Sequence, residues 1–171
     1  MSDAEGTPAR GLLTDSFGRR IESFRISVTD RCDLRCVYCI PEDIPWLPRS
    51  QLLSLEELAR VARLAVAGGV RKIRITGGEP LLRRALPHLI ELLAAIPGLE
   101  DLALTTNGTQ LAKLAAPLRA AGLERVNVSL DSLERETFQR MAQRDSLDRV
   151  LEGIDAAVAA GLWPIRINCV P

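Results

Sequence analysis

Three cysteines lie close together between Cys32 and Cys39, at spacings of four and three residues. Cysteine thiolates are the usual ligands of iron in iron–sulfur clusters, and three of them on one short loop can reach a common cluster. A four-iron cluster normally takes four such ligands, so three leave one iron open to another molecule. The segment therefore predicts a reactive iron–sulfur cluster held by Cys32, Cys36 and Cys39.

Two other interpretations of these cysteines stay open at this point. A zinc site needs a fourth ligand, and the remaining candidates are the distant Cys169 and His88, which lies in a helix-like segment. Disulfide pairing would leave one thiol over and would need an oxidising compartment, of which the sequence gives no sign. The rest of the sequence is needed to choose between them.

The composition of the 171 residues is ordinary for a globular domain, with 47% apolar and 26% charged residues. The 22 basic side chains equal the 22 acidic ones, which argues against a nucleic-acid polymer or an acidic membrane surface as a partner. The first twenty residues include acidic side chains and no continuous apolar segment, so we expect no signal peptide. No apolar stretch is long enough to span a bilayer. A single cytoplasmic domain is expected.

After a flexible lead-in over residues 1–20, short β-type segments alternate with helical ones. Strands are predicted at residues 24–29, 72–76, 102–106, 125–130 and 165–170. Helices are predicted at residues 83–95, 110–121, 134–141 and 147–160, and from Ser54, where Glu57 completes a capping box and Gly68 ends the helix. This alternation predicts an α/β fold with parallel strands and right-handed crossovers, whose functional residues lie at the strands' carboxyl ends.

Within these strands apolar side chains alternate with polar ones, although parallel strands buried on both faces usually read as continuous apolar runs. The polar set consists of Arg25, Lys72, Arg74, Thr105, Asn127, Ser129, Arg166 and Asn168. One interpretation is an open sheet with one solvated face. The other is a curved sheet around a polar chamber, whose buried cations would need a phosphorylated or carboxylated ligand. On the same pattern Cys169 faces the helices and is predicted to be a buried core thiol.

A second motif, from Thr76 to Pro80, follows the second predicted strand and reads Thr-Gly-Gly-Glu-Pro. Its two glycines let the backbone approach a ligand closely, Glu79 adds a carboxylate acceptor, and Pro80 pre-sets the start of a helix. Alone, the motif is common turn chemistry. One strand–helix unit after the cysteines, it becomes a strong indication of a shared site.

Together the two motifs resemble the radical S-adenosylmethionine (SAM) superfamily, in which an aromatic residue, here Tyr38, precedes the third cysteine. More specifically, residues 25–32, 72–80, 104–108 and 127–131 resemble the GTP 3′,8-cyclase family of molybdenum cofactor biosynthesis. The similarity runs from about Asp15 to Val170. It implies a partial (β/α) barrel, with residues 21–171 forming an incomplete radical SAM core of about five strands.

The resemblance also implies the chemistry. Cys32, Cys36 and Cys39 would hold a 4Fe-4S cluster whose open iron chelates SAM, and one electron would cleave SAM to methionine and a 5′-deoxyadenosyl radical. That radical would take a hydrogen from the ribose of GTP, and the ribose carbon would close onto the guanine to give (8S)-3′,8-cyclo-7,8-dihydroguanosine 5′-triphosphate. SAM contacts are implied for Tyr38, Gly77, Gly78, Glu79 and Ser129. GTP contacts are implied for Arg25, also counted as catalytic, and for Lys72, Arg74, Thr105 and Arg166.

Further partners follow from the same resemblance: an electron donor of the flavodoxin or ferredoxin kind, a downstream pterin-forming enzyme, and a second copy of the chain in a homodimer. Family members continue into a carboxyl-terminal region with a second cysteine triplet and a second 4Fe-4S cluster. The sequence ends at Pro171 without it. We therefore expect an amino-terminal part that does not convert GTP alone.

Three residues depart from the family pattern. Arg166 stands where a lysine is usual, which keeps the charge but presents a planar fork. Asp33 in place of Asn and Ile40 in place of Met are expected to matter little. The alternatives to a cyclase are another radical SAM enzyme, such as a peptide-modifying one, and a non-catalytic iron–sulfur- or zinc-binding module or inert fragment.

Overall fold

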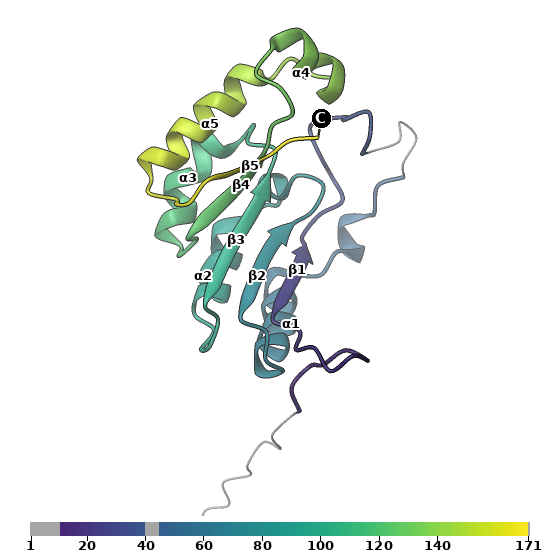
Figure 1. Cartoon of the computed structure of the whole chain (residues 1–171), viewed down its shortest axis with the longest axis vertical. Helices are drawn as coiled ribbons and strands as arrows, with labels where there is room; N and C mark the ends of the chain where they lie inside the picture. Colours follow the sequence, from purple (N-terminus) through teal and green to yellow (C-terminus); the bar gives the residue numbers. More distant parts are fainter. Residues whose placement is uncertain (1–10, 40–44, 171) are drawn as a thin grey trace, which may run out of the picture.

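The computed structural model describes residues 11–39 and 45–170, and its centre is a five-stranded parallel sheet with helices along one face (Figure 1). The strands lie side by side in chain order, so each crossover leads to the neighbouring strand. They are β1 Ser23–Ser27, β2 Lys72–Thr76, β3 Asp101–Thr106, β4 Arg125–Ser129 and β5 Arg166–Asn168. The α/β prediction and all five predicted strands are confirmed.

The helices also follow the prediction, with one shifted start. They are α1 Leu55–Ala67, α2 Leu86–Ala94, α3 Leu111–Ala120, α4 Arg135–Ala142 and α5 Leu147–Ala159, with 3-10 turns η1 Arg49–Gln51 and η2 Pro80–Leu82. The capping box of Ser54 and Glu57 is present, and Gly68 ends α1. Helix α2 begins at Leu86, later than predicted, because Ala85 before it has a left-handed backbone conformation; Pro87 lies in the first turn, where its missing N–H is not needed.

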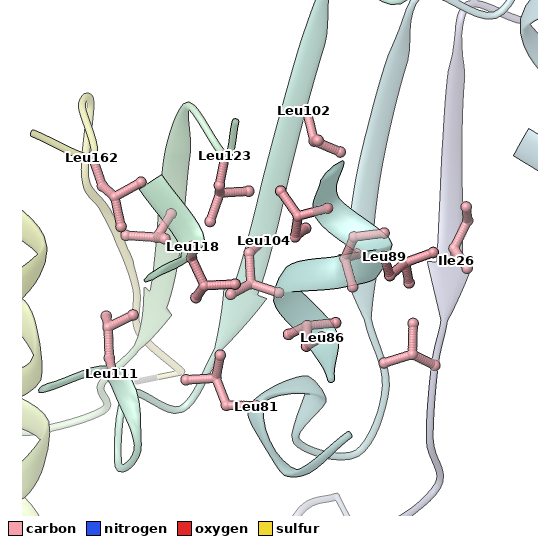
Figure 2. Packing of buried hydrophobic residues seen from close by; sticks show 14 of the residues in the cluster. Ile26, Leu81, Leu86, Leu89, Leu102, Leu104, Leu111, Leu118, Leu123 and Leu162 are labelled. Atoms are coloured by element: carbon pink, nitrogen blue, oxygen red, sulfur yellow. The ribbon is translucent and has the colours of Figure 1, made fainter. Parts of the chain in front are cut away.

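The core lies between the sheet and the helices and is built mainly of leucine and isoleucine (Figure 2). Leu104 of β3, Leu89 of α2 and Leu118 of α3 are fully buried there. Burial of a side chain of this kind contributes roughly 1.5–3 kcal/mol. This apolar layer holds the strands in register, so it also sets the positions of the polar side chains on the opposite face. No helix among the described residues is long and apolar enough to cross a bilayer.

The prediction that Cys169 is a buried core thiol is wrong. Cys169 is exposed, and its thiol donates to the backbone oxygen of Asp131 at 3.3 Å. Strand β5 is the edge strand of the described sheet, and all three of its residues are exposed. Helix α5 packs mainly on α3 and not on β5, so the alternation along this strand does not correspond to burial.

Two other expectations fall partly or wholly outside the described residues. Of the lead-in predicted over residues 1–20, residues 11–20 are described and form a turn in which Thr14 and Arg20 make an isolated bridge. Asp15 stabilises this turn by accepting hydrogen bonds from the backbone of Phe17 and Arg19. Ile40 lies outside the described residues.

The contact between α3 and α5 depends on Gly153, and we predict that Gly153→Ala destabilises the fold. A methyl group there would lie 2.5 Å from the backbone oxygen of Gly108 and 3.0 Å from Cβ of Leu111. Alanine favours an isolated helix by about 1 kcal/mol, but overpacking against backbone costs roughly 1–3 kcal/mol. Because the 2.5 Å contact is with backbone, which cannot rotate away, the upper end of that range applies and urea unfolding should show a net loss of about 2 kcal/mol. Glu152→Ala, at the exposed neighbouring position, is the control, and equal stability of both variants would contradict the packing.

Candidate functional site

The cysteine loop follows β1 and is fixed at the far side of the sheet by the end of α4 (Figure 1). The backbone N–H of Arg35 donates to Ala142 and that of Val37 donates to Met141, both at 3.0 Å. The side chain of Arg35 also donates to the backbone oxygens of Cys32 and Leu34. The loop therefore crosses the carboxyl ends of the strands, as the sequence predicts for a site of this fold.

The four cysteines of the chain are free thiols, and those of the loop differ in exposure. Cys32 and Cys36 are partly buried, whereas Cys39 is exposed. Burial raises the pKa of Cys32 to about 11 and raises the pKa of Cys36. Such thiols stay protonated at neutral pH unless a bound cation favours the thiolate, which is the form that metals bind.

The donor set of the loop fits an iron–sulfur cluster: three thiols on one segment, with an amide beside the first. The Nδ2 of Asn107 donates to the sulfur of Cys32 at 3.7 Å, and N–H groups near cluster sulfurs tune such centres. Within residues 11–39 and 45–170, no three His, Cys, Asp or Glu side chains converge closely enough to hold a metal ion. The fit therefore rests on the donor types and their common loop.

Asp33 anchors the cysteine loop to the segment after β3. One carboxylate oxygen accepts from Nδ2 of Asn107 at 2.8 Å, and the other accepts from the hydroxyl of Thr109 at 2.6 Å. The same Asn107 side chain accepts from the backbone N–H of Thr109 at 3.0 Å. The expectation that Asp in place of Asn matters little stays a prediction, because an asparagine here could still accept from Asn107. The partners of Asp33 lie more than seventy residues away, and the sequence did not indicate them.

The Gly-Gly-Glu-Pro turn packs directly beneath the cysteine loop. A side-chain methyl at Gly78 would lie 2.4 Å from the backbone oxygens of Asp30 and Arg31, so only glycine fits. The N–H of Gly78 donates to Thr29, and that of Glu79 donates to Arg31, both at 2.7 Å. The sequence suggested that glycine here lets a ligand approach the backbone. In the structure, glycine is required at this turn because the segment before the cysteines packs against it.

Glu79 is 1% exposed, and its carboxylate is surrounded by donors from the protein. It accepts from the hydroxyl of Thr106 and the N–H of Asn107 at 2.7 Å, and from the N–H of Leu81 at 2.9 Å. Burial raises the pKa of this carboxyl to about 7, while the hydrogen bonds act in the opposite direction. Its geometry is that of a residue that positions the turn and the Asn107 segment.

Parallel register places the cationic side chains of the polar face in rows across the sheet. Arg25 is opposite Arg74, which is followed by Ala103 and Arg125 in the same row. Burial, and then the positive charges of Arg125, Arg25 and Arg166, lower the pKa of Arg74. A hollow of about 120 Å³ lies at the strands' amino ends, between Arg25, Lys72, Arg74 and Arg125. The rows bring together positive charges that are far apart in the sequence.

Two residues of this face, Asp101 and Arg125, were not selected from the sequence. The guanidinium of Arg125 binds Asp101 through two hydrogen bonds, one of them 2.9 Å from Nε to Oδ1. This pair raises the pKa of Arg125, and Asp101 lies beside Lys72 in the register. Arg125 lies two and four residues before Asn127 and Ser129 on the same strand, so the alternation of polar and apolar residues would have placed it on the same face.

The next row contains Thr105, Asn127 and Arg166. Asn127 is 2% exposed, yet within the described residues its Oδ1 has no hydrogen-bond partner, and neither has Nη1 of Arg125. Arg25, Lys72 and Arg166 are exposed, whereas Arg74 and Ser129 are partly buried. The sheet therefore has an open polar face with a shielded centre, which combines elements of both interpretations of the strand alternation.

Tyr38 is joined to the opposite edge of the sheet through Asp131, a residue for which the sequence indicated no role. The Tyr38 hydroxyl donates to one carboxylate oxygen of Asp131 at 2.6 Å, and the N–H of Val170 donates to the other at 3.0 Å. Burial and this hydrogen bond raise the pKa of Tyr38. The cysteine loop and the segment after β5 thus meet above the sheet (Figure 1).

The chain matches a known family and several curated proteins. The family model of the radical SAM superfamily matches residues 26–171. GTP 3′,8-cyclase of Ectopseudomonas mendocina (strain ymp) is 60% identical over 158 residues, covering 92% of this chain and 48% of that protein. GTP 3′,8-cyclase of Acidothermus cellulolyticus is 56% identical over 164 residues, covering 92% and 45%. The chain spans about half the length of the curated relatives it matches.

Solved structures show the same fold at low sequence identity. Streptococcus suis SuiB bound to its precursor peptide SuiA matches with a TM-score of 0.69 at 20% identity, over 86% of this chain and 32% of that one. HydG, a maturase of the [FeFe]-hydrogenase, matches with a TM-score of 0.71 at 16% identity, over 86% and 34%. The predicted partial barrel is confirmed by these likenesses.

The raised pKa of Glu79 predicts a specific pH dependence of stability. The carboxyl titrates near 7 when folded and near 4.5 as a free side chain, so the folded state retains the proton longer. The protonated carboxyl contributes to the free energy of unfolding in full below about pH 4.5. This contribution is lost as pH rises to about 7, a decrease of about 3 kcal/mol. Urea unfolding between pH 5 and 8 should show this slope in the wild type and not in Glu79→Gln. Glu91→Gln, an exposed control, should keep it; a slope unchanged in Glu79→Gln would contradict the assignment.

The network around Asp33 predicts different effects for two substitutions. Asp33→Ala removes the 2.8 Å acceptor of the Asn107 amide and leaves the Thr109 hydroxyl only Oδ1 of Asn107 as an acceptor, which should cost about 1–3 kcal/mol of unfolding free energy and lower the iron bound after anaerobic reconstitution. Asp33→Asn keeps an acceptor for Asn107 and lets the Thr109 hydroxyl accept, so both quantities should stay near wild type. If the two variants behave alike, Asp33 does not position the loop.

Proposed function

The chain belongs to the radical SAM superfamily, and we propose that it forms the part of a GTP 3′,8-cyclase that binds SAM and the triphosphate of GTP. The proposed reaction is the conversion of GTP to its 3′,8-cyclo derivative, the first step of molybdenum cofactor biosynthesis. The proposed partners are a one-electron donor, which would reduce the cluster, and an enzyme that would consume the cyclised product.

In this proposal Cys32, Cys36 and Cys39 hold the 4Fe-4S cluster, which when bound supplies one-electron reducing chemistry toward SAM. The chain contributes the surroundings of the three thiolates. Asn107 donates an N–H to the sulfur of Cys32, and Asp33 orients that amide. The hydrogen bonds to Met141 and Ala142 hold the backbone of the loop over the strand ends, so the segment that carries the three cysteines is placed there by the chain itself.

The turn at Gly77 and Gly78 suits the methionyl end of SAM. The N–H of Gly78 is already bonded to Thr29, and no described backbone N–H donates to the carbonyl oxygen of Gly77 or Gly78. These oxygens are free acceptors for an ammonium group. Tyr38, oriented by Asp131, and Ser129, partly buried at the end of β4, are the further residues proposed to contact SAM.

The observation that carries the GTP proposal is the group of cations on the polar face without acidic partners. Among the described residues, Arg25, Lys72, Arg74 and Arg166 lie in no ion pair, and the carboxylate of Asp101 is bound to Arg125. Guanidinium groups bind phosphate oxygens through paired hydrogen bonds. A triphosphate would neutralise these cations and reduce the repulsion that, after burial, lowers the pKa of Arg74.

Polar groups beside the cations add to this support. Nη1 of Arg125 and Oδ1 of Asn127 are buried and, within the described part of the chain, without partners. Buried polar groups left unpaired cost roughly 1–3 kcal/mol each, so a ligand that supplies an acceptor and a donor here would be favoured. Thr105, beside Asn127 in the register, offers a hydroxyl to the same ligand.

The proposal predicts that affinity depends on phosphate number. Isothermal titration of the 171-residue chain should give decreasing affinity from GTP to GMP to guanosine. The double variant Arg25→Ala/Arg74→Ala should weaken GTP binding at least tenfold, because charge-assisted hydrogen bonds contribute roughly 1.5–3 kcal/mol each, and should change guanosine binding little.

Arg60→Ala/Arg63→Ala, which removes two exposed arginines of α1, is the control with the same change in net charge. An equal loss of GTP affinity in both double variants would mean that binding depends on net charge and not on the arginines of the polar face. Equal affinity for GTP and guanosine would overturn the substrate assignment and favour another radical SAM reaction, such as peptide modification.

A further inference from the structure

We propose that the chain has a second anion site, which takes a small phosphorylated molecule and is separate from the polar face of the sheet. A cavity of about 430 Å³ lies where the end of β1, η1, the start of α1 and the turn after η2 meet. This volume is in the range of small-molecule sites. None of its lining residues lines the hollow on the polar face, so the inference does not depend on the proposed binding of GTP.

Among the residues that the structure describes, the cavity is lined by four arginines and by no acidic side chain. Arg31 comes from the segment before the first cysteine, Arg49 from η1, and Arg83 and Arg84 from the turn after η2. Within the described residues none of the four lies in an ion pair. Four positive charges around one cavity repel one another, and an anion that binds several of them removes this cost.

One of these arginines is already held in place. Nη2 of Arg83 donates to the backbone oxygen of Leu53 at 2.6 Å, which ties the turn after η2 to the segment before α1. The turn ends at Ala85, a non-glycine residue with φ of 55°, a conformation that costs roughly 1–2 kcal/mol. Leu53 and Arg83 thus fix the shape of the cavity before a ligand arrives.

The start of α1 adds to the positive field. Leu55, the first residue of this thirteen-residue helix, lines the cavity, and helix N-termini favour anions. The two glutamates of the first turn have other partners: Glu57 accepts from the backbone of Ser54, and Glu56 lies 3.8 Å from His88. They therefore do not take the place of a ligand anion.

The remaining lining defines the rest of the ligand. Leu52, Leu55 and Leu82 supply apolar surface between the arginines. Arginines beside apolar surface in a concave site suit a molecule with one or two phosphates and a compact organic part, of sugar-phosphate or mononucleotide size. A flat acidic protein surface would contact the arginines but would leave the cavity unfilled, so the geometry favours the small molecule.

Titration of the full chain with inorganic pyrophosphate tests the site. The background is Arg25→Ala/Arg74→Ala, which removes the proposed triphosphate cations, so one class of sites should remain. Adding Arg49→Ala/Arg84→Ala should weaken that binding at least tenfold, whereas adding Arg60→Ala/Arg63→Ala should change it less than twofold. All of these arginines except Arg74 are exposed, and thermal unfolding of each variant checks the fold.

Ribose 5-phosphate and AMP, compared with inorganic phosphate, test the apolar part of the site. Tighter binding of the organic phosphates, weakened by Leu82→Ser, supports the proposed ligand class. Pyrophosphate binding that persists in the Arg49→Ala/Arg84→Ala background, or falls equally in the control, overturns the site. Binding of an acidic peptide without binding of pyrophosphate also overturns it in favour of a protein surface. Complete loss of pyrophosphate binding by Arg25→Ala/Arg74→Ala alone also overturns the site, whereas loss of one class of sites with another retained bears only on the GTP proposal.

Discussion

The structure depends on one buried carboxylate, that of Glu79, which connects three segments that form the site. Its carboxylate accepts from Thr106 at the end of β3, from the following Asn107 and from the backbone of Leu81. The N–H of Glu79 donates to Arg31, before the first cysteine. Asn107 in turn reaches Cys32 and Asp33. Because buried donors need acceptors, displacement of any one segment would leave polar groups unpaired, so the glycine turn and the cysteine loop keep a fixed relative position.

The polar face follows from a different constraint, the register of parallel strands. Parallel neighbours in a sheet place side chains that point to the same face side by side. Arg25, Arg74 and Arg125 therefore lie in one row, although a hundred residues separate the first from the last. The apolar face, packed on the helices, fixes that register. A concentration of positive charge on one face is thus the consequence of hydrophobic packing on the other.

Sequence periodicity was sufficient where local rules apply and failed where contacts are distant. It placed Asn127 and Arg166 on the polar face correctly, because the alternation of side chains along a strand depends only on neighbouring residues. It misplaced Cys169 because burial of that position depends on whether α5 covers β5, and α5 packs on α3. It also missed Asp131, whose carboxylate joins Tyr38 and Val170. These partners come from separate elements and leave no periodic pattern.

The sequence by itself determined the fold class, the order of strands and helices, the three thiols and the glycine turn, because capping, periodicity and motif spacing are properties of neighbouring residues. Only the tertiary structure decided which groups share hydrogen bonds and which charges lie unpaired. Asp33 became an anchor through Asn107 and Thr109, and Arg49 became a neighbour of Arg84 across a cavity. Such relations arise from the packing of whole elements, whose relative positions depend on all of their contacts at once.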